Sequence, residues 1–366
     1  MAAKALRVLI SGGLAVGGVQ THVTMLSRVL RAAGAEVTVA ASASNWPASA
    51  LDDLRDAGVR VVLPTFTAMR NQSRLAKAEA LMTWPFRLKR NFDVLYCHGH
   101  GRMHLWMRRF LHKDGICIYH ELIEAPKSGS MMARVASSMD MIIAPTETIA
   151  ERVVDAVGPC RICVIPFFST EYPVAERKFA SPPEKRELRV AYFGRLVKHK
   201  QPDWLVREWS KIANQFPLAP ARLDVYGADY PDDPMLESLR GFVREQGLEN
   251  QVALHGAYDH NDLSLLDNTD LVLLPSRVEG LPLVLLEAVQ HGVPFVAMNA
   301  GGIASLLEDN PDVMVTPINN ADFVAAVHSM AYKLRNGEID QQRLSRWAKS
   351  RYGVEVLSIR WRELIL

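Results

Sequence analysis

Short apolar runs alternate with stretches of helical periodicity along the whole chain. In the first half, the apolar runs predict strands at 6–10, 36–40, 59–63, 94–97, 115–119, 141–144 and 162–166. In the second half, they predict strands at 188–193, 223–227, 252–255, 271–274 and 295–298. The segments between them are expected to be helical, including a first helix that ends at Arg31 and a last one near 354–366. This alternation favours an α/β fold with parallel sheets and crossover helices.

A polar, proline-rich stretch separates the two series of strands and predicts a linker at 171–187. We therefore expect an N-terminal Rossmann-like domain at 1–170 and a C-terminal one at 188–349. The last helix, within 350–366, is expected to cross back onto the first domain. A chain of 366 residues is too long for one compact core. The prediction is two doubly wound domains facing across a cleft, with the ligand site at the carboxyl ends of the strands.

Charge is distributed unevenly between the two halves. Residues 1–168 hold 20 Lys and Arg against 13 Asp and Glu, a formal charge of +7, and the remaining residues carry −5. Basic residues are densest from Arg70 to Lys113, where ten stand against two acidic residues. The same segment contains Trp84, Phe86, Trp106 and Phe110. Two interpretations stay open: a surface that contacts an anionic membrane, or a solvated basic face with the aromatic rings in the core. No nucleic-acid recognition motif accompanies the basic residues, so no nucleic-acid partner is expected.

Several features predict a cytoplasmic protein. No apolar segment has the length of a membrane-spanning helix, and the apolar N-terminal stretch is broken by glycines without a clear cleavage site. The four cysteines agree with a reducing compartment. Cys160 and Cys163 form an isolated Cys-x-x-Cys, which we interpret as packed thiols because nothing nearby completes a zinc site.

Two carboxylates stand eight residues apart after the apolar run at 271–274. Glu279 is expected in the loop between strand and helix, and Glu287 near the second turn of a helix that Pro282 begins. Ionised carboxylates at the carboxyl end of a parallel strand suit ligand hydroxyls, because each accepts several hydrogen bonds. This spacing is the strongest indication of a ligand site in the sequence.

Other candidate positions also follow predicted strands. Arg195 and Lys200 come after the strand at 188–193 and together suit a pyrophosphate, although surface solvation explains such a pair equally well. Gly301 and Gly302 follow the strand at 295–298, where they would either admit an anion to backbone N–H groups or form a simple tight turn. Gly17 and Gly18 open the first helix without the Gly-x-Gly-x-x-Gly spacing of dinucleotide sites, so they add little to a nicotinamide hypothesis.

Taken in order, these motifs resemble the retaining glycosyltransferases of family 4, which have the GT-B fold. The matching segments are Gly17-Gly18, Gly194-Arg195-Leu196 with Lys200, Tyr226-Gly227, Val252 to Gly256, Asp270 to Ser276, Glu279 to Pro282, Glu287-Ala288, Gly292 to Pro294 and Gly301-Gly302. Each motif is weak alone, but their joint order and spacing are specific, most of all over 188–305.

The resemblance implies a role for each matching residue. Glu287 would bind the ribose hydroxyls of a nucleotide sugar, Glu279 would bind hydroxyls of the transferred sugar, and Arg195 with Lys200 would neutralise the diphosphate. The donor would also contact Gly17, Gly18, Gly227, Leu281, Gly301, Gly302 and Ile303. His120 is the candidate for orienting donor and acceptor, with His98 and His100 as competitors. For each histidine, a structural role is the alternative.

The activity implied is metal-independent transfer from a nucleotide sugar, most commonly a UDP-sugar in the family, with retention of anomeric configuration. The acceptor would be a saccharide or a lipid-linked sugar, in polysaccharide or glycolipid synthesis. A lipid-linked acceptor would suit a peripheral position on the inner face of the cytoplasmic membrane. The alternatives are an inactive nucleotide-sugar-binding protein and a sugar-nucleotide epimerase. Two departures concern loop conformation: Phe167-Phe168 replaces the usual Asn-Gly, and Lys200-Gln201 replaces Lys-Gly.

Overall fold

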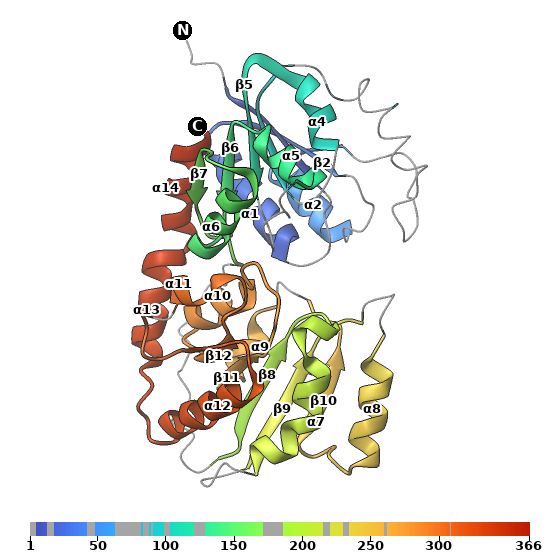
Figure 1. Cartoon of the computed structure of the whole chain (residues 1–366), viewed down its shortest axis with the longest axis vertical. Helices are drawn as coiled ribbons and strands as arrows, with labels where there is room; N and C mark the ends of the chain where they lie inside the picture. The colour runs from blue at the N-terminus through green and yellow to red at the C-terminus, as the bar shows by residue number, and fades with distance from the viewer. Residues whose placement is uncertain are drawn as a thin grey trace. The chain divides into compact units, whose positions relative to one another are not determined.

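The computed structural model describes residues 5–12, 18–41, 48–62, 82, 88, 91–98, 103–120, 129–170, 186–214, 220–229, 234–259, 262–307 and 309–366. The chain divides into two compact units, which Figure 1 shows in full. The first unit comprises Met1–Ser169 and Val354–Leu366, and the second comprises Thr170–Gly353. Each unit contains one sheet in which every paired strand is parallel, so the predicted α/β architecture with two doubly wound sheets is confirmed.

The first unit is built on a seven-stranded sheet in the order β3-β2-β1-β4-β5-β6-β7. Its strands are β1 (Arg7–Gly12), β2 (Glu36–Ala41), β3 (Arg60–Val62), β4 (Phe92–His98), β5 (Leu111–His120), β6 (Met141–Ala144) and β7 (Ile162–Val164). Its helices are α1 (Gly18–Ala32), α2 (Ala48–Asp56), α4 (Met103–Met107), α5 (Met131–Ser137), α6 (Glu147–Val157) and α14 (Val354–Ile365), with the 3-10 turn η1 (Arg108–Phe110).

Side chains on opposite faces of this sheet enter two separate cores, because successive residues of a strand point to opposite sides. Val8 and Ile10 of β1 pack in one core with residues of α1, α2 and α14. Leu9, between them, packs in the other core with residues of η1, α5 and α6. Helix α14 thus returns from the far end of the chain to the face that α1 also covers, and it buries Trp361 completely there.

The second unit is built on a six-stranded sheet in the order β10-β9-β8-β11-β12-β13. Its strands are β8 (Leu188–Phe193), β9 (Ala221–Tyr226), β10 (Val252–Gly256), β11 (Leu271–Leu274), β12 (Phe295–Met298) and β13 (Met314–Thr316). Its helices are α7 (Pro202–Ala213), α8 (Leu236–Glu245), α9 (Ser264–Asp267), α10 (Leu283–Gln290), α11 (Ala304–Leu307), α12 (Asn320–Arg335) and α13 (Gln341–Tyr352), with the 3-10 turns η2 (Lys198–Lys200) and η3 (Ala300–Gly302).

Both sheets reverse their direction of growth at one point. In the second unit the chain runs from β8 outward to β10, and then returns to add β11 on the other side of β8. In the first unit the same reversal lies between β1 and β4. Loops at the carboxyl ends of two such strands separate and leave space for a ligand. The fold therefore directs attention to the loops after β8 and β11, and to the ends of β1 and β4.

The last helix, predicted near 354–366, is confirmed as α14; Gly353 before it is extended, with ψ at 151°, so α13 ends at Tyr352. One predicted helix start was wrong by a residue. Pro282 is the N-cap of α10 and not its first residue, because its ψ of 109° is also extended. Strand β13 was not predicted at all. Within the described residues, no helix is long and apolar enough to cross a membrane.

The basic segment from Arg70 to Lys113 is only partly described, and Trp84 and Phe86 lie outside the described residues. Phe110 is 1% exposed, and Trp106 packs against the same core with its ring edge to that of Phe110. The guanidinium of Arg109 lies 4.7 Å from the centre of the Trp106 ring. At these two positions the aromatic rings serve the core, while the membrane role of the segment stays a prediction.

Candidate functional site

The loops after β8 and β11 are tied together by hydrogen bonds. The amide of the Gln201 side chain donates to the carbonyl of Pro275 at 2.6 Å, and its oxygen accepts from Nε of Arg277 at 3.0 Å. The backbone N–H of Arg277 donates to the carbonyl of His199 at 2.8 Å. Residues from two distant parts of the sequence therefore form one hydrogen-bonded cluster where the sheet changes direction.

Gln201 stands where the resemblance predicted a glycine, and its backbone is left-handed, with φ at 55°. This region favours glycine, and another residue there carries a cost of about 1–2 kcal/mol. The two hydrogen bonds of its buried side chain offset that cost. The loop thus keeps a conformation that suits glycine, and the glutamine adds a link to the neighbouring loop.

Lys200 and Glu279 form an ion pair across these two loops. Nζ of Lys200 lies 2.6 Å from Oε1 of Glu279, and the two side chains are 14% and 8% exposed. A carboxylate this deeply buried requires a partner, which Lys200 supplies. Each group keeps further capacity, since the ammonium has three donors and the carboxylate about four acceptor sites. The pair can therefore present a positive charge and hydroxyl acceptors side by side.

The turn at Gly301 packs directly on the backbone of the Glu279 loop. A Cβ atom at Gly301 would lie 2.3 Å from the carbonyl oxygen of Glu279 and 2.4 Å from that of Gly280. Gly301 and Gly302 also have positive φ values of 67° and 80°. Only glycine satisfies both conditions at Gly301, so the turn after β12 braces the loop that carries Glu279. Ile303, the next residue, is fully buried.

Gly227 permits a similar close approach beside β8. A Cβ atom there would lie 2.0 Å from the carbonyl oxygen of Gly194, so no side chain fits.

Arg195 follows Gly194 and is exposed, while its carbonyl accepts from the hydroxyl of Tyr192 at 3.1 Å. Leu281 is buried in the loop before α10.

Glu287 lies at the beginning of the second turn of α10, as predicted, and is 9% exposed. One carboxylate oxygen accepts from the backbone N–H of Thr170 at 3.3 Å. Burial raises the pKa of Glu287 to about 7, against an ordinary 4.5. Burial also raises the pKa of Tyr258, and the charge of Glu287 adds to that rise. Tyr258 was not predicted, because its sequence position carries no signal of this electrostatic interaction.

In the first unit, His98 and His120 are the last residues of β4 and β5 and are paired in register. Both are fully buried. Gly18 begins α1, whereas Gly17 and His100 lie outside the described residues. The structure brings His120 together with two residues that the sequence did not indicate, His22 and Tyr96. His22 stands one helical turn after Gly18, and that spacing is the signal that could have drawn attention to it.

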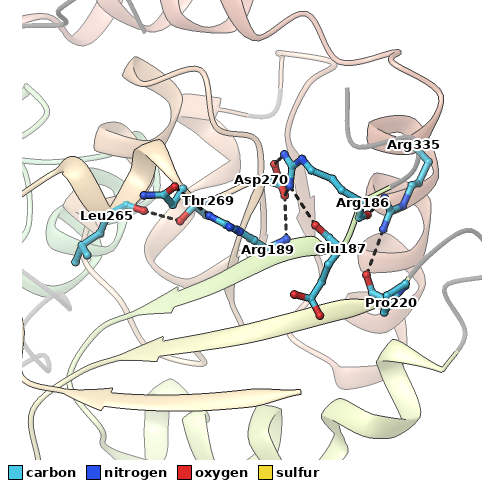
Figure 2. Close-up of polar contacts among 9 residues, drawn as sticks. Arg186, Glu187, Arg189, Pro220, Leu265, Thr269, Asp270 and Arg335 are labelled. Atoms are coloured by element: carbon cyan, nitrogen blue, oxygen red, sulfur yellow. Dashed lines mark hydrogen bonds and ion pairs between the residues drawn. The ribbon is translucent and has the colours of Figure 1, made fainter. Parts of the chain in front are cut away.

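A second polar cluster lies at the opposite edge of the second sheet, at the amino ends of β8, β9 and β11 (Figure 2). Asp270 accepts from the guanidinium of Arg186 at 2.8 and 2.6 Å, and from the N–H of Arg189 at 2.9 Å. Arg335 donates to the carbonyls of Arg186 and Pro220 at 2.5 and 3.4 Å. A hollow of about 320 Å³ adjoins this cluster and is lined by Glu187, Arg189, Arg222, Asp224, Tyr226, Leu265, Asn268 and Thr269. The lining of the hollow contains two acidic and two basic residues, so their formal charges cancel. We assign the cluster a structural role.

Two family models match the two halves of the chain. The model described as Glycosyltransferase Family 4 matches residues 16–167, and the one described as Glycosyl transferases group 1 matches 187–332. The second match contains Lys200, Glu279 and Glu287. With the two parallel-sheet units, these matches support a glycosyltransferase of the GT-B fold.

Particular relatives agree with this class. An uncharacterised glycosyltransferase of Haemophilus influenzae is 27% identical over 176 residues, which are 47% of this chain and 47% of that protein. The chain thus spans about half the length of this relative. A glycosyltransferase from Rickettsia africae superposes with a TM-score of 0.75 at 12% identity, over 99% of this chain and 98% of the other. HepE of Anabaena, solved with UDP and glucose, superposes with a TM-score of 0.73 at 17% identity, over 98% of this chain and 99% of the other. The GT-B fold is therefore confirmed.

Proposed function

We propose that this protein is an active glycosyltransferase that moves a sugar from a nucleotide-sugar donor to a saccharide or lipid-linked acceptor. The observation that carries the proposal is the Lys200–Glu279 ion pair where the second sheet changes direction, followed by the buried carboxylate of Glu287. The structure of HepE with UDP and glucose supports a UDP-sugar as the donor. Retention of anomeric configuration, and a place in polysaccharide or glycolipid synthesis, rest on the family resemblance.

In the proposed complex, the diphosphate takes hydrogen bonds from Lys200, and hydroxyls of the sugar donate to Glu279. Arg195 adds positive charge beside the phosphates. As the nucleoside diphosphate departs, negative charge grows on its phosphate oxygens while the sugar gains oxocarbenium character. A fixed ammonium stabilises that growing charge without rearrangement of the site. The ion pair already holds the ammonium in place before the donor binds.

Glu287 is proposed to bind the ribose hydroxyls, and its raised pKa makes that role testable by pH. Hydroxyl donors favour the ionised carboxylate, so nucleotide binding should lower the pKa of Glu287 from about 7 and release a proton below that pH. We therefore expect nucleotide affinity to rise between about pH 5 and about pH 8. The Glu287→Gln variant should bind more weakly at pH 8, by about 1.5–3 kcal/mol, and lose the pH dependence. Calorimetric titration with UDP and with GDP, ADP and CMP measures both effects.

In the absence of nucleotide, the free energy of unfolding should fall as pH rises, whereas nucleotide affinity should rise. The pKa of Glu287 is higher in the folded protein than its ordinary value, so the folded state binds more protons between pH 4.5 and about 7. Stability from this group is thus lost as pH rises through that interval, and Glu287→Gln should remove the loss. The matched control is Glu237→Gln, an exposed position on α8. Nucleotide affinity that is unchanged by Glu287→Gln at pH 8 contradicts the ribose assignment.

A further inference from the structure

Three polar side chains form a buried, hydrogen-bonded series near the carboxyl ends of the strands of the first sheet. His22 of α1, Tyr96 of β4 and His120 of β5 are 1%, 0% and 0% exposed. The ring of Trp361 from α14 closes over them, with its centre 5.0 Å from that of His22 and 5.6 Å from that of His120. Burial of this degree excludes water, so the hydrogen bonds among the three side chains determine where their protons lie.

The direction of these hydrogen bonds follows from one backbone group. The N–H of Phe168 donates to Nδ1 of His22 at 3.1 Å, and a backbone N–H has no other role available. Nδ1 of His22 is therefore an acceptor, and neutral His22 carries its proton on Nε2. That proton is donated to the hydroxyl oxygen of Tyr96, 3.0 Å away. The hydroxyl of Tyr96 has one further partner among the described residues, Nδ1 of His120, and its single proton is satisfied only by donation to that nitrogen.

These hydrogen bonds leave His120 with its proton on Nε2. Burial, with His22 and His98 nearby, holds the pKa of His120 well below its ordinary value, so the ring is neutral at physiological pH. Burial likewise lowers the pKa of His22 to about 3. Among the described residues, Nε2 of His120 has no hydrogen-bond partner. A buried N–H donor without a partner carries a free-energy penalty, which a ligand oxygen would remove once a shift of the covering side chains lets it reach Nε2.

We infer that His22 and Tyr96 are positioning residues, which hold His120 as a neutral imidazole that donates a hydrogen bond from Nε2 to an oxygen of the donor or acceptor. The inference rests on the proposed function for its substrate, but not for the proton positions. It assigns His120 a donor role and excludes Nε2 as a general base, because that nitrogen already carries the proton. The backbone N–H of Phe168 sets the direction of the whole series of hydrogen bonds.

The test is Tyr96→Phe in the 366-residue chain, which removes one hydroxyl and keeps the ring. Long-range ¹H–¹⁵N NMR of histidine-labelled protein should show both His22 and His120 as neutral Nε2–H tautomers from about pH 5 to about pH 8. In Tyr96→Phe, His22 should remain the Nε2–H tautomer, because the N–H of Phe168 still donates to its Nδ1. His120 should become a mixture of the two neutral tautomers. For the substrates on which the wild type is active, kcat/KM should fall by about tenfold.

Tyr119→Phe is the matched control, because Tyr119 is equally buried but packs in the core on the other face of the sheet. It should leave the His120 tautomer unchanged. An Nδ1–H tautomer or a protonated ring at His120 in the wild type near pH 7 would overturn the inference. So would a Tyr96→Phe variant with an unchanged tautomer or with unchanged kcat/KM. Failure of the proposed function is a separate result, since the NMR spectra report the proton positions in a protein without any transfer activity.

Discussion

Changing Lys200 to alanine is expected to lower the rate of sugar transfer by about 100- to 1,000-fold, the loss typical of one fixed group that stabilises transition-state charge. Nζ of Lys200 is held 2.6 Å from Glu279 in a loop that Gln201 braces, so its position is set before the donor binds. Its charge matters most when the diphosphate leaves. Nucleotide affinity should therefore fall much less than kcat does.

Steady-state kinetics and calorimetric titration of the same preparation separate these two effects. Removal of Lys200 also leaves Glu279 buried without its ion-pair partner, so thermal unfolding must show that the variant is folded at the assay temperature. Lys198→Ala is the matched control, because it removes an exposed lysine from the same turn, η2. Turnover of Lys200→Ala at the wild-type rate would refute the proposed role.

Changing Gly301 to alanine is expected to destabilise the second unit by about 3 kcal/mol or more and to abolish transfer. The new Cβ would approach two carbonyl oxygens of the Glu279 loop to 2.3 and 2.4 Å, at a residue whose φ is 67°. A left-handed backbone alone adds about 1–2 kcal/mol for a residue with a side chain. Relief of the collision would require the Glu279 loop to shift, which would disturb the ion pair between Glu279 and Lys200.

Gly241→Ala gives the contrasting control for that variant. Gly241 lies inside α8, and a Cβ atom there would meet nothing within 4 Å. Alanine at such a position should stabilise the protein by about 0.5–1 kcal/mol. Urea unfolding of the two variants measures both differences against the wild type. If Gly301→Ala unfolds at the wild-type urea concentration, the Gly301 turn does not brace the Glu279 loop.

Much of the fold was predictable because the central strands are short, mainly apolar and bounded by turn residues. Predicted strands at 188–193, 271–274 and 295–298 agree with β8, β11 and β12 residue for residue. Strand β13 has only three residues, too few for an apolar pattern. Strand β5 begins at Leu111, earlier than predicted, because its first residues are largely exposed and show no apolar run.

Part of the candidate site could be predicted from strand ends alone. Lys200 and Glu279 each follow a predicted strand, and the reversal between β8 and β11 makes those loops neighbours. Their ion pair was not predicted, because partner choice depends on loop conformations that the sequence does not reveal. The same holds for Tyr96, whose hydroxyl meets its partners only after α1, β4, β5 and α14 have packed together.

Turnover of nucleotide sugars tests the central claim most directly. The 366-residue chain is incubated with UDP-, GDP-, ADP- and CMP-linked sugars, each with a set of simple saccharide and lipid-linked acceptors. Released nucleotide is measured by ion-exchange chromatography. We expect release from at least one donor, accompanied by a glycosylated acceptor and lowered about 100-fold or more by Lys200→Ala. Folded protein that binds none of these donors, or releases nucleotide equally well without Lys200, would contradict a glycosyl-transfer site built on Lys200 and Glu279.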